Sequence, residues 1–141
     1  KPLVYRLSHS GVKVNVTAVL SLRQVQEAAD ALNGGAPSAL SIFAGRIADT
    51  GRDPVPLMRE ALAIVKDVPS IEVIWASPRE VLNVYQADDI GCHIVTVTSG
   101  ILAKLGLAGK DLDEFSLDTV RMFRTDAIKA GFELSGDEQP A

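Results

Sequence analysis

The sequence has 141 residues, of which 47% are hydrophobic and 23% charged, so it can bury the core of about one domain and does not have the composition of a disordered tail. Its net charge is −4 and its basic residues are scattered, which argues against nucleic acid as a partner because nucleic-acid-binding proteins carry a basic patch. The single cysteine excludes an intrachain disulfide and fits a cytoplasmic setting, and no apolar run approaches the ~18–20 residues of a membrane helix.

Helix and strand signals alternate along the whole chain. Runs of β-branched and apolar residues indicate strands, and apolar residues at helical spacing indicate helices. In chain order these signals predict a helix over 1–10, a strand over 12–20, a helix over 22–32, a strand over 38–44, a polar loop over 45–54, a helix over 55–68, a strand over 71–76, a helix over 78–90, a strand over 92–98, a short helix over 101–107 and a final helix over 111–130.

Several residues suggest where these helices begin and end. Ser21 is expected to cap the helix over 22–32, and the glycines after Asn33 to end it. Pro78 is tolerated in the first turn of its helix, because the N–H that it lacks would be unpaired there. Ser116 is a possible cap for the last helix, and Gly131 is expected to end it.

Four strand–helix units in series imply an α/β fold with parallel strands joined by right-handed crossovers. The strands are near-continuous apolar runs, which is typical of sheets covered on both faces. An open sheet of four strands can stand alone, whereas half of an eight-stranded barrel expects four further strands. The helix over 1–10 begins without a cap, as expected of a chain cut from something longer. No glycine-rich loop follows the first strand, which argues against a complete flavodoxin-like domain.

Polar residues occur in or just after each predicted strand. Asn15 and Thr17 are two residues apart, so they point to one face of the sheet, and the same holds for Ser41 and Phe43. Ligands of parallel α/β proteins bind at the carboxyl ends of the strands, where we expect these side chains to lie. The remaining polar residues at strand ends are Arg46, Ser77, Arg79, Thr96 and Thr98.

Arg46 and Arg79 carry planar, always-charged groups that suit a phosphate. Arg79 is predicted in the first turn of a helix, where free backbone N–H groups also favour anions. Together with the hydroxyl and amide groups, the two arginines indicate a small, phosphorylated, polyhydroxylated substrate. The two histidines, His9 and His93, lie far apart without cysteines at ligand spacing, so the sequence indicates no metal site.

Each of these residues also has an ordinary structural explanation. Asn15 can satisfy neighbouring backbone groups, and the threonines are common strand formers. The two arginines can be solvated surface charges. Phe43 and Trp75 belong to a residue class that is more often found in a core than in a ligand wall, and Cys92 and His93 are expected to be structural.

At these positions the sequence resembles the transaldolase family, which is related to fructose 6-phosphate aldolase. The strings NVTA, S-x-F-x-G-R-I and A-S-x-R together carry the resemblance, which runs over about residues 2–134. It implies the C-terminal half of a (β/α)8 TIM barrel, strands 5 to 8, over residues 1–134, with residues 135–141 as a flexible tail. Pro78 departs from the family, because many relatives have an aromatic residue there, but it leaves Ser77 and Arg79 in register.

The resemblance implies an enzyme of the pentose phosphate pathway that transfers dihydroxyacetone through a lysine Schiff base and needs no cofactor. Its implied substrates are fructose 6-phosphate, sedoheptulose 7-phosphate and erythrose 4-phosphate. By motif, Asn15 matches the position beside the dihydroxyacetone unit, Thr17 the position that helps to place the catalytic water, Ser41 and Phe43 the sugar-contacting positions, and Arg46, Ser77 and Arg79 the phosphate-binding positions.

The lysine that forms the Schiff base belongs to a family strand that precedes the segment matching Pro2, so the resemblance implies that it is not in this chain. Lys13 is a weaker alternative, since it is the only lysine on a predicted strand and a buried lysine can have a lowered pKa. It would lie two residues, or ~6–7 Å, deeper than Asn15. Lys1 is expected in the loop after the missing strand.

These considerations leave three functions open. The first is a transaldolase of which this chain is a fragment, inactive alone. The second is a non-catalytic half-barrel that binds sugar phosphate or associates with a partner half. The third is a fructose 6-phosphate aldolase. Because the edges of half a barrel are unpaired, we expect either the missing N-terminal half or self-association to cover them.

Overall fold

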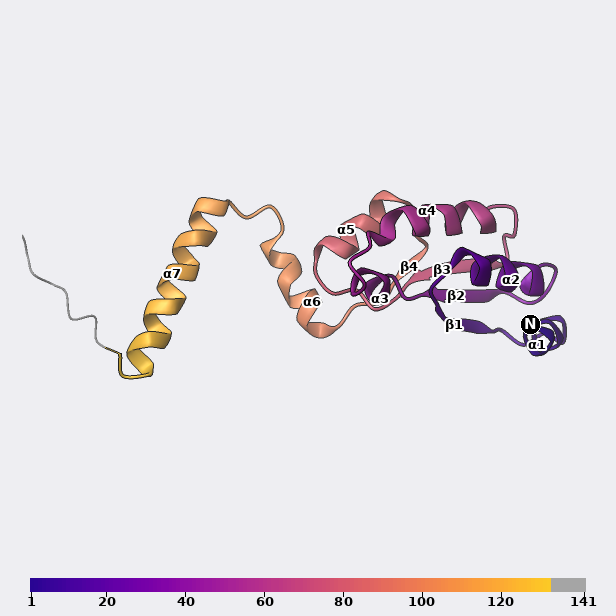
Figure 1. Cartoon of the computed structure of the whole chain (residues 1–141), viewed down its shortest axis with the longest axis horizontal. Coiled ribbons are helices and arrows are strands. Elements are labelled where there is room, and N and C mark those ends of the chain that lie inside the picture. Colours follow the sequence, from indigo (N-terminus) through magenta and orange to yellow (C-terminus); the bar gives the residue numbers. More distant parts are fainter. Residues whose placement is uncertain (133–141) are drawn as a thin grey trace, which may run out of the picture. The chain divides into compact units, whose positions relative to one another are not determined.

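The computed structural model describes residues 1–132 and confirms the α/β class (Figure 1). Its contacts divide the chain into two units, of which the first is Lys1–Leu105 and the second begins at Gly106. The first unit holds one parallel sheet in the order β1-β2-β3-β4, so each strand pairs with the one before it in the chain. The strands are β1 (Asn15–Val19), β2 (Ser38–Ile42), β3 (Ile71–Trp75) and β4 (Ile94–Val95).

Helices fill the connections between these strands. Ser21 caps its helix as predicted: its hydroxyl accepts from the N–H of Gln24 at 3.4 Å, and the Gln24 amide oxygen accepts from the N–H of Ser21 at 3.1 Å. This reciprocal pair is a capping box, which satisfies two backbone donors at the helix start. The helices of the first unit are α1 (Pro2–His9), α2 (Leu22–Leu32), α3 (Ala44–Ala48), α4 (Pro54–Val65), α5 (Leu82–Asp89) and α6 (Ser99–Lys104).

Two connections differ from the predictions. The prediction of a polar loop over 45–54 is wrong, because α3 occupies the first half of this segment. In its second half, Asp53 caps α4 by accepting from the N–H of Val55 at 2.9 Å. The helix predicted over 78–90 begins only at Leu82. Ser77 has a left-handed backbone, with φ +62°, and this turns the chain away from a helical path before Arg79.

The fourth unit is also shorter than predicted. The strand predicted over 92–98 is reduced to β4, because the chain turns at Thr98 to begin α6. The Thr98 hydroxyl accepts from the N–H of Ile101 at 3.3 Å and caps that helix. The short helix predicted over 101–107 therefore starts earlier and continues as a 3-10 turn over Leu105–Leu107.

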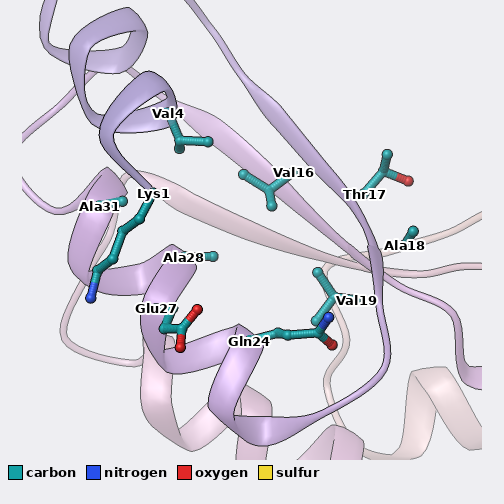
Figure 2. A pocket seen from close by; sticks show the side chains of 10 residues that line it. All are labelled: Lys1, Val4, Val16, Thr17, Ala18, Val19, Gln24, Glu27, Ala28 and Ala31. Carbon is teal, nitrogen blue, oxygen red and sulfur yellow. The ribbon is translucent and has the colours of Figure 1, made fainter.

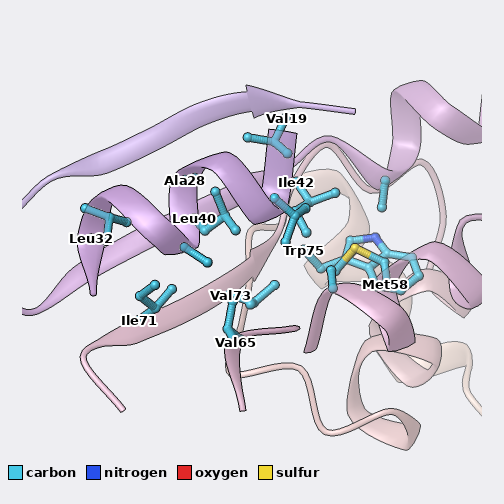
Figure 3. Packing of buried hydrophobic residues seen from close by; sticks show 14 of the residues in the cluster. Val19, Ala28, Leu32, Leu40, Ile42, Met58, Val65, Ile71, Val73 and Trp75 are labelled. Carbon is cyan, nitrogen blue, oxygen red and sulfur yellow. The ribbon is translucent and has the colours of Figure 1, made fainter. Parts of the chain in front are cut away.

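The hydrophobic core lies on one face of the sheet (Figure 3). Leu40 lies beside Val73 and Ile42 beside Trp75 in the register of β2 and β3, and none of the four is exposed. On the other face, Asn15, Ala39 and Glu72 lie in one row, and the first and last of them are exposed. Successive right-handed crossovers in a 1-2-3-4 order put the connecting helices on the same side. The expectation of a sheet covered on both faces is therefore wrong for the part of the chain that the structure describes.

The second unit contains α7 (Leu112–Lys129). Asp111, not Ser116, caps this helix, because its carboxylate accepts from the N–H groups of Asp113 and Glu114 at 3.0 Å. Gly131, with φ +78°, follows the helix end as predicted. Within residues 1–132, no helix combines the length and the apolar character that crossing a bilayer requires. The predicted tail over 135–141 and the last two residues of the predicted domain over 1–134 lie outside the described residues.

Candidate anion-binding site

The segments that follow β2 and β3 are neighbours, because the carboxyl ends of parallel strands share one edge of the sheet. Backbone hydrogen bonds hold them together: the N–H of Ala76 donates to Ile42 O at 2.8 Å, and the N–H of Gly45 donates to Ala76 O at 3.4 Å. The start of α3 therefore lies against the turn that follows β3. This contact brings the S-x-F-x-G-R-I and A-S-x-R strings together.

Gly45 makes this contact possible. A Cβ atom at position 45 would lie 1.5 Å from the carbonyl oxygen of Ser77 and 2.6 Å from its carbonyl carbon. Only a residue without a side chain fits so close to another backbone. No local sequence pattern indicated a role for Gly45, although the residue is part of the string that carries the resemblance.

A buried amide holds the turn after β3. Asn83 is 7% exposed, and its Oδ1 accepts from the backbone N–H groups of Arg79 at 2.7 Å and Glu80 at 3.2 Å. Its Nδ2 donates to the Gln86 side chain at 3.0 Å, so both ends of the amide are used. Sequence reasoning missed Asn83; a polar residue at helical spacing from the apolar residues Ala87 and Ile90 was the available signal.

Replacing Asn83 by alanine should lower the free energy of unfolding by about 1–3 kcal/mol, because two backbone donors lose their acceptor. Asn83→Asp keeps the accepting oxygen and should cost less. Urea unfolding of the two variants and the parent chain measures the difference. Equal losses for both variants would contradict the assignment of Oδ1 as the important atom.

The guanidinium of Arg79 extends over α3 and pairs with Asp49, the residue that ends this helix. Its Nε donates to Asp49 Oδ1 at 3.1 Å, and its Nη2 donates to Asp49 Oδ2. Arg46 is exposed and lies three residues before Asp49 on the same helix, which places both on one side of it. The cluster therefore holds two positive charges, on Arg46 and Arg79, and one negative charge, on Asp49.

The prediction that Arg79 opens a helix is wrong, since α5 starts three residues later. The free N–H groups of a helix N-terminus therefore do not support anion binding at Arg79. Ser77 lies two residues before Arg79, and it is half-buried. The structure thus brings together the three residues predicted to bind phosphate, Arg46, Ser77 and Arg79, at one edge of the sheet.

Asn15 and Ser41 form a second polar group on the open face of the sheet. The Ser41 hydroxyl donates to Asn15 Oδ1 at 2.8 Å, and Ser41 is buried while Asn15 is exposed. Asn15 is the first residue of β1, so the expectation that it lies near the carboxyl end of its strand is wrong. Thr17 is exposed beside an irregularity in the pairing of β1 with β2. Within residues 1–132, no hydrogen bond joins this group to the arginine cluster.

The two aromatic candidates behave differently. Phe43 is half-buried just after β2, at the start of α3, so it lies between the two polar groups along the chain. Trp75 is fully buried on the core face, which supports its structural explanation. The Trp75 indole N–H has no hydrogen-bond partner among the described residues.

The two lysine candidates lie away from the arginine cluster. Lys13 precedes β1 and is exposed, so the prediction that it sits on a strand is wrong and the burial that would favour it as a nucleophile is absent. The Lys1 ammonium pairs with Asp30 at 3.2 Å, on the outer side of α2. In the described part of the chain, no group of histidine, cysteine or acidic residues could hold a metal ion.

Cys92 and His93 have structural contacts at the start of β4. Burial raises the pKa of the Cys92 thiol, and its Sγ donates to Val73 O at 3.4 Å. His93 Nδ1 accepts from the backbone N–H of Val73 at 3.0 Å. Both side chains thus extend the pairing of β3 with the short strand β4.

A hollow of about 170 Å³ lies along the free edge of β1, between α1 and α2 (Figure 2). Its apolar wall is formed by Val4, Val16, Val19, Ala28 and Ala31. Figure 2 shows Val16 and Val19 directed towards α2 and Thr17 directed away from it. The hollow is lined by none of the arginine-cluster residues, so it is a separate feature of the sheet edge.

Comparison with known proteins identifies similar chains. Residues 2–135 match the family model described as transaldolase/fructose-6-phosphate aldolase. A probable transaldolase of Nitrosopumilus maritimus is 38% identical over 101 residues, which are 70% of this chain and 44% of that protein. A probable transaldolase of Herpetosiphon aurantiacus is 34% identical over 119 residues, which are 82% of this chain and 52% of that protein. The chain thus spans about half the length of the curated relatives that it matches.

Proposed function

Because the chain belongs to the transaldolase/fructose-6-phosphate aldolase family, we propose that it forms the phosphate-binding part of a transaldolase. The complete enzyme transfers dihydroxyacetone between fructose 6-phosphate, sedoheptulose 7-phosphate and erythrose 4-phosphate, in the cytoplasmic pentose phosphate pathway. The observation that carries this proposal is the cluster of Arg46, Ser77 and Arg79, which the close contact at Gly45 assembles from two separate strand ends.

In the proposed complex, the phosphate lies between Arg46 and Arg79. Their guanidinium groups donate charge-assisted hydrogen bonds to the phosphate oxygens, and the Ser77 hydroxyl adds a neutral donor. Phe43 follows β2 immediately, and Ser41 lies one residue before the end of that strand. The sugar chain then extends from the phosphate towards the open face, where Ser41 and Asn15 are hydrogen-bonded. In the proposed reaction, Asn15 lies beside the dihydroxyacetone unit and Thr17 places the water.

We also propose that residues 1–134 are strands 5 to 8 of a TIM barrel. Three observations support this arrangement: the strands are parallel and in sequential order, the core lies on one face, and polar residues lie on the other. The position of α1 provides a fourth, since this helix packs against α2 and lines the hollow beside β1. In the proposed barrel, a strand that precedes α1 would lie beside β1 and direct side chains into the hollow.

The nucleophile is proposed to come from outside residues 1–141. We expect no covalent adduct when the chain is incubated with fructose 6-phosphate and borohydride, because Lys1 pairs with Asp30 and Lys13 is exposed before the start of β1, further from the carboxyl ends of the strands than Asn15. Intact-mass spectrometry measures the added dihydroxyacetone unit. An adduct mapped to Lys13 or Lys1 would overturn the proposal and make this chain a self-sufficient enzyme.

One alternative shares the same geometry. A half-barrel that binds sugar phosphate without turnover is favoured by the observation that the arginine cluster is assembled although none of the four strands within residues 1–132 carries a lysine. It predicts phosphate-dependent binding without an adduct, and no activity when the remaining strands are supplied. A fructose 6-phosphate aldolase would instead cleave its substrate in the absence of an aldose acceptor, and product analysis on the complete protein distinguishes the two reactions.

A further inference from the structure

Arg79 is held at its backbone and at two places along its side chain. Its backbone N–H is bound to the buried oxygen of Asn83 at 2.7 Å. Its Nε lies 3.3 Å from the position of a Cβ at Gly45, so the stem passes closely over α3. Its guanidinium then meets both carboxylate oxygens of Asp49. Asp49 is the only one of these three partners that carries a charge, and it is half exposed, with 50% of its side chain accessible.

The pairing leaves much of the guanidinium free for a ligand. An arginine has five N–H donors in a planar fork. The contact with Asp49 uses Nε and Nη2, which form one edge of that fork. In the described part of the chain, Nη1 makes no hydrogen bond, and it lies on the edge that faces away from Asp49. A phosphate can therefore bind Arg79 without displacing Asp49.

A long side chain that is already held in place binds with a smaller loss of conformational freedom than one that must first be ordered. From these contacts we infer that Asp49 is a positioning residue for the phosphate site: it fixes the guanidinium of Arg79 so that its free edge faces the phosphate. The inference rests on the proposed function, because it assumes that Arg46, Ser77 and Arg79 bind a phosphate.

The charge of Asp49 makes this role testable by the sign of its effect. A carboxylate beside a bound phosphate repels it, so removing the charge alone strengthens anion binding. If the carboxylate also orders Arg79, removing it weakens anion binding, because the guanidinium must then be ordered when the phosphate binds. The structural explanation, an ordinary surface ion pair, predicts an unchanged or tighter complex in Asp49→Asn. The positioning role predicts a weaker one.

The experiment measures binding of fructose 6-phosphate and of unphosphorylated fructose to the full chain by titration calorimetry. The variants are Asp49→Asn, Arg79→Gln and, as a matched control, Glu80→Gln. Glu80 is exposed, adjacent to Arg79 and in no ion pair in the described part of the chain, so its variant removes one negative charge without touching the guanidinium. We expect Asp49→Asn to weaken binding of fructose 6-phosphate about five- to tenfold, the effect of ordering one long side chain. Glu80→Gln should leave binding equal or slightly tighter.

A second measurement on the same proteins separates positioning from general destabilisation. Hydrogen exchange of the Arg79 Nε–H, followed by NMR without ligand, should be faster in Asp49→Asn than in the parent chain and unchanged in Glu80→Gln. Asp49→Asn should fold, because half-exposed ion pairs contribute little to stability. The role of Asp49 would be overturned if Asp49→Asn bound fructose 6-phosphate as tightly as Glu80→Gln while Arg79→Gln lost affinity. This outcome would leave the proposed function intact. A parent chain that binds both sugars equally would overturn both.

Discussion

Replacing Gly45 by alanine is expected to destabilise the chain by at least about 3 kcal/mol, the upper end of the usual cost of overpacking. The added Cβ would lie 1.5 Å from the Ser77 carbonyl oxygen, and the atom it meets belongs to the backbone rather than to a flexible side chain. Relief therefore requires α3 and the turn after β3 to separate. Urea unfolding, followed by circular dichroism, measures the loss.

Gly100→Ala is the matched control for this prediction. Gly100 lies in α6, and a Cβ there meets only the Thr98 hydroxyl at 3.9 Å. Because alanine is a better helix former than glycine, this variant should be neutral or slightly more stable. The account of the contact at Gly45 would be wrong if Gly45→Ala unfolded at the same urea concentration as Gly100→Ala.

Arg79→Gln is expected to weaken binding of fructose 6-phosphate by about 10- to 100-fold, because each hydrogen bond from a charged donor contributes roughly 1.5–3 kcal/mol. Binding of unphosphorylated fructose should change little, since the arginine is proposed to contact only the phosphate. Titration of both sugars gives the ratio of the two affinities, which isolates the phosphate contribution from any general effect of the substitution.

Arg52→Gln is the control, because it removes the same positive charge from a residue that is not proposed to contact the phosphate. Arg52 is exposed, three residues beyond Asp49 in the segment that leads to α4. If long-range attraction alone holds the phosphate, the two variants should weaken binding equally. A specific site requires Arg79→Gln to lose affinity and Arg52→Gln to retain it at physiological salt, where exposed charges are screened over about 8 Å.

Local signals were sufficient for much of the fold. The helix α2 was predicted with its cap from Ser21 alone, and the structure shows why a local signal was enough: the capping partner, Gln24, lies within one turn of Ser21. The parallel pairing of the strands followed from the alternation of helices and strands. The short helix α3 could not be predicted, since the Gly45–Pro54 segment is rich in polar and turn-forming residues and the helix forms only where it packs against the turn after β3.

The candidate site was predicted only in part for a similar reason. The motifs indicated Arg46, Ser77 and Arg79, and the structure places them close together, although their role in binding phosphate stays a prediction. Gly45 and Asp49 owe their importance to contacts with a segment about 30 residues further along the chain, as the Asp49–Arg79 pair shows. A pattern within one short stretch of sequence cannot indicate a contact between residues so far apart in the chain.

The sequential order of the strands bears on how the sheet is made. Asn15 pairs with Ala39 and Ile74 pairs with Ile94, so every pairing in the sheet joins neighbouring segments of the chain. During synthesis, which proceeds from the N-terminus, each new strand therefore meets a partner that has already left the ribosome. Such a sheet can grow one unit at a time, because each new pairing closes a loop no longer than the crossover between two successive strands.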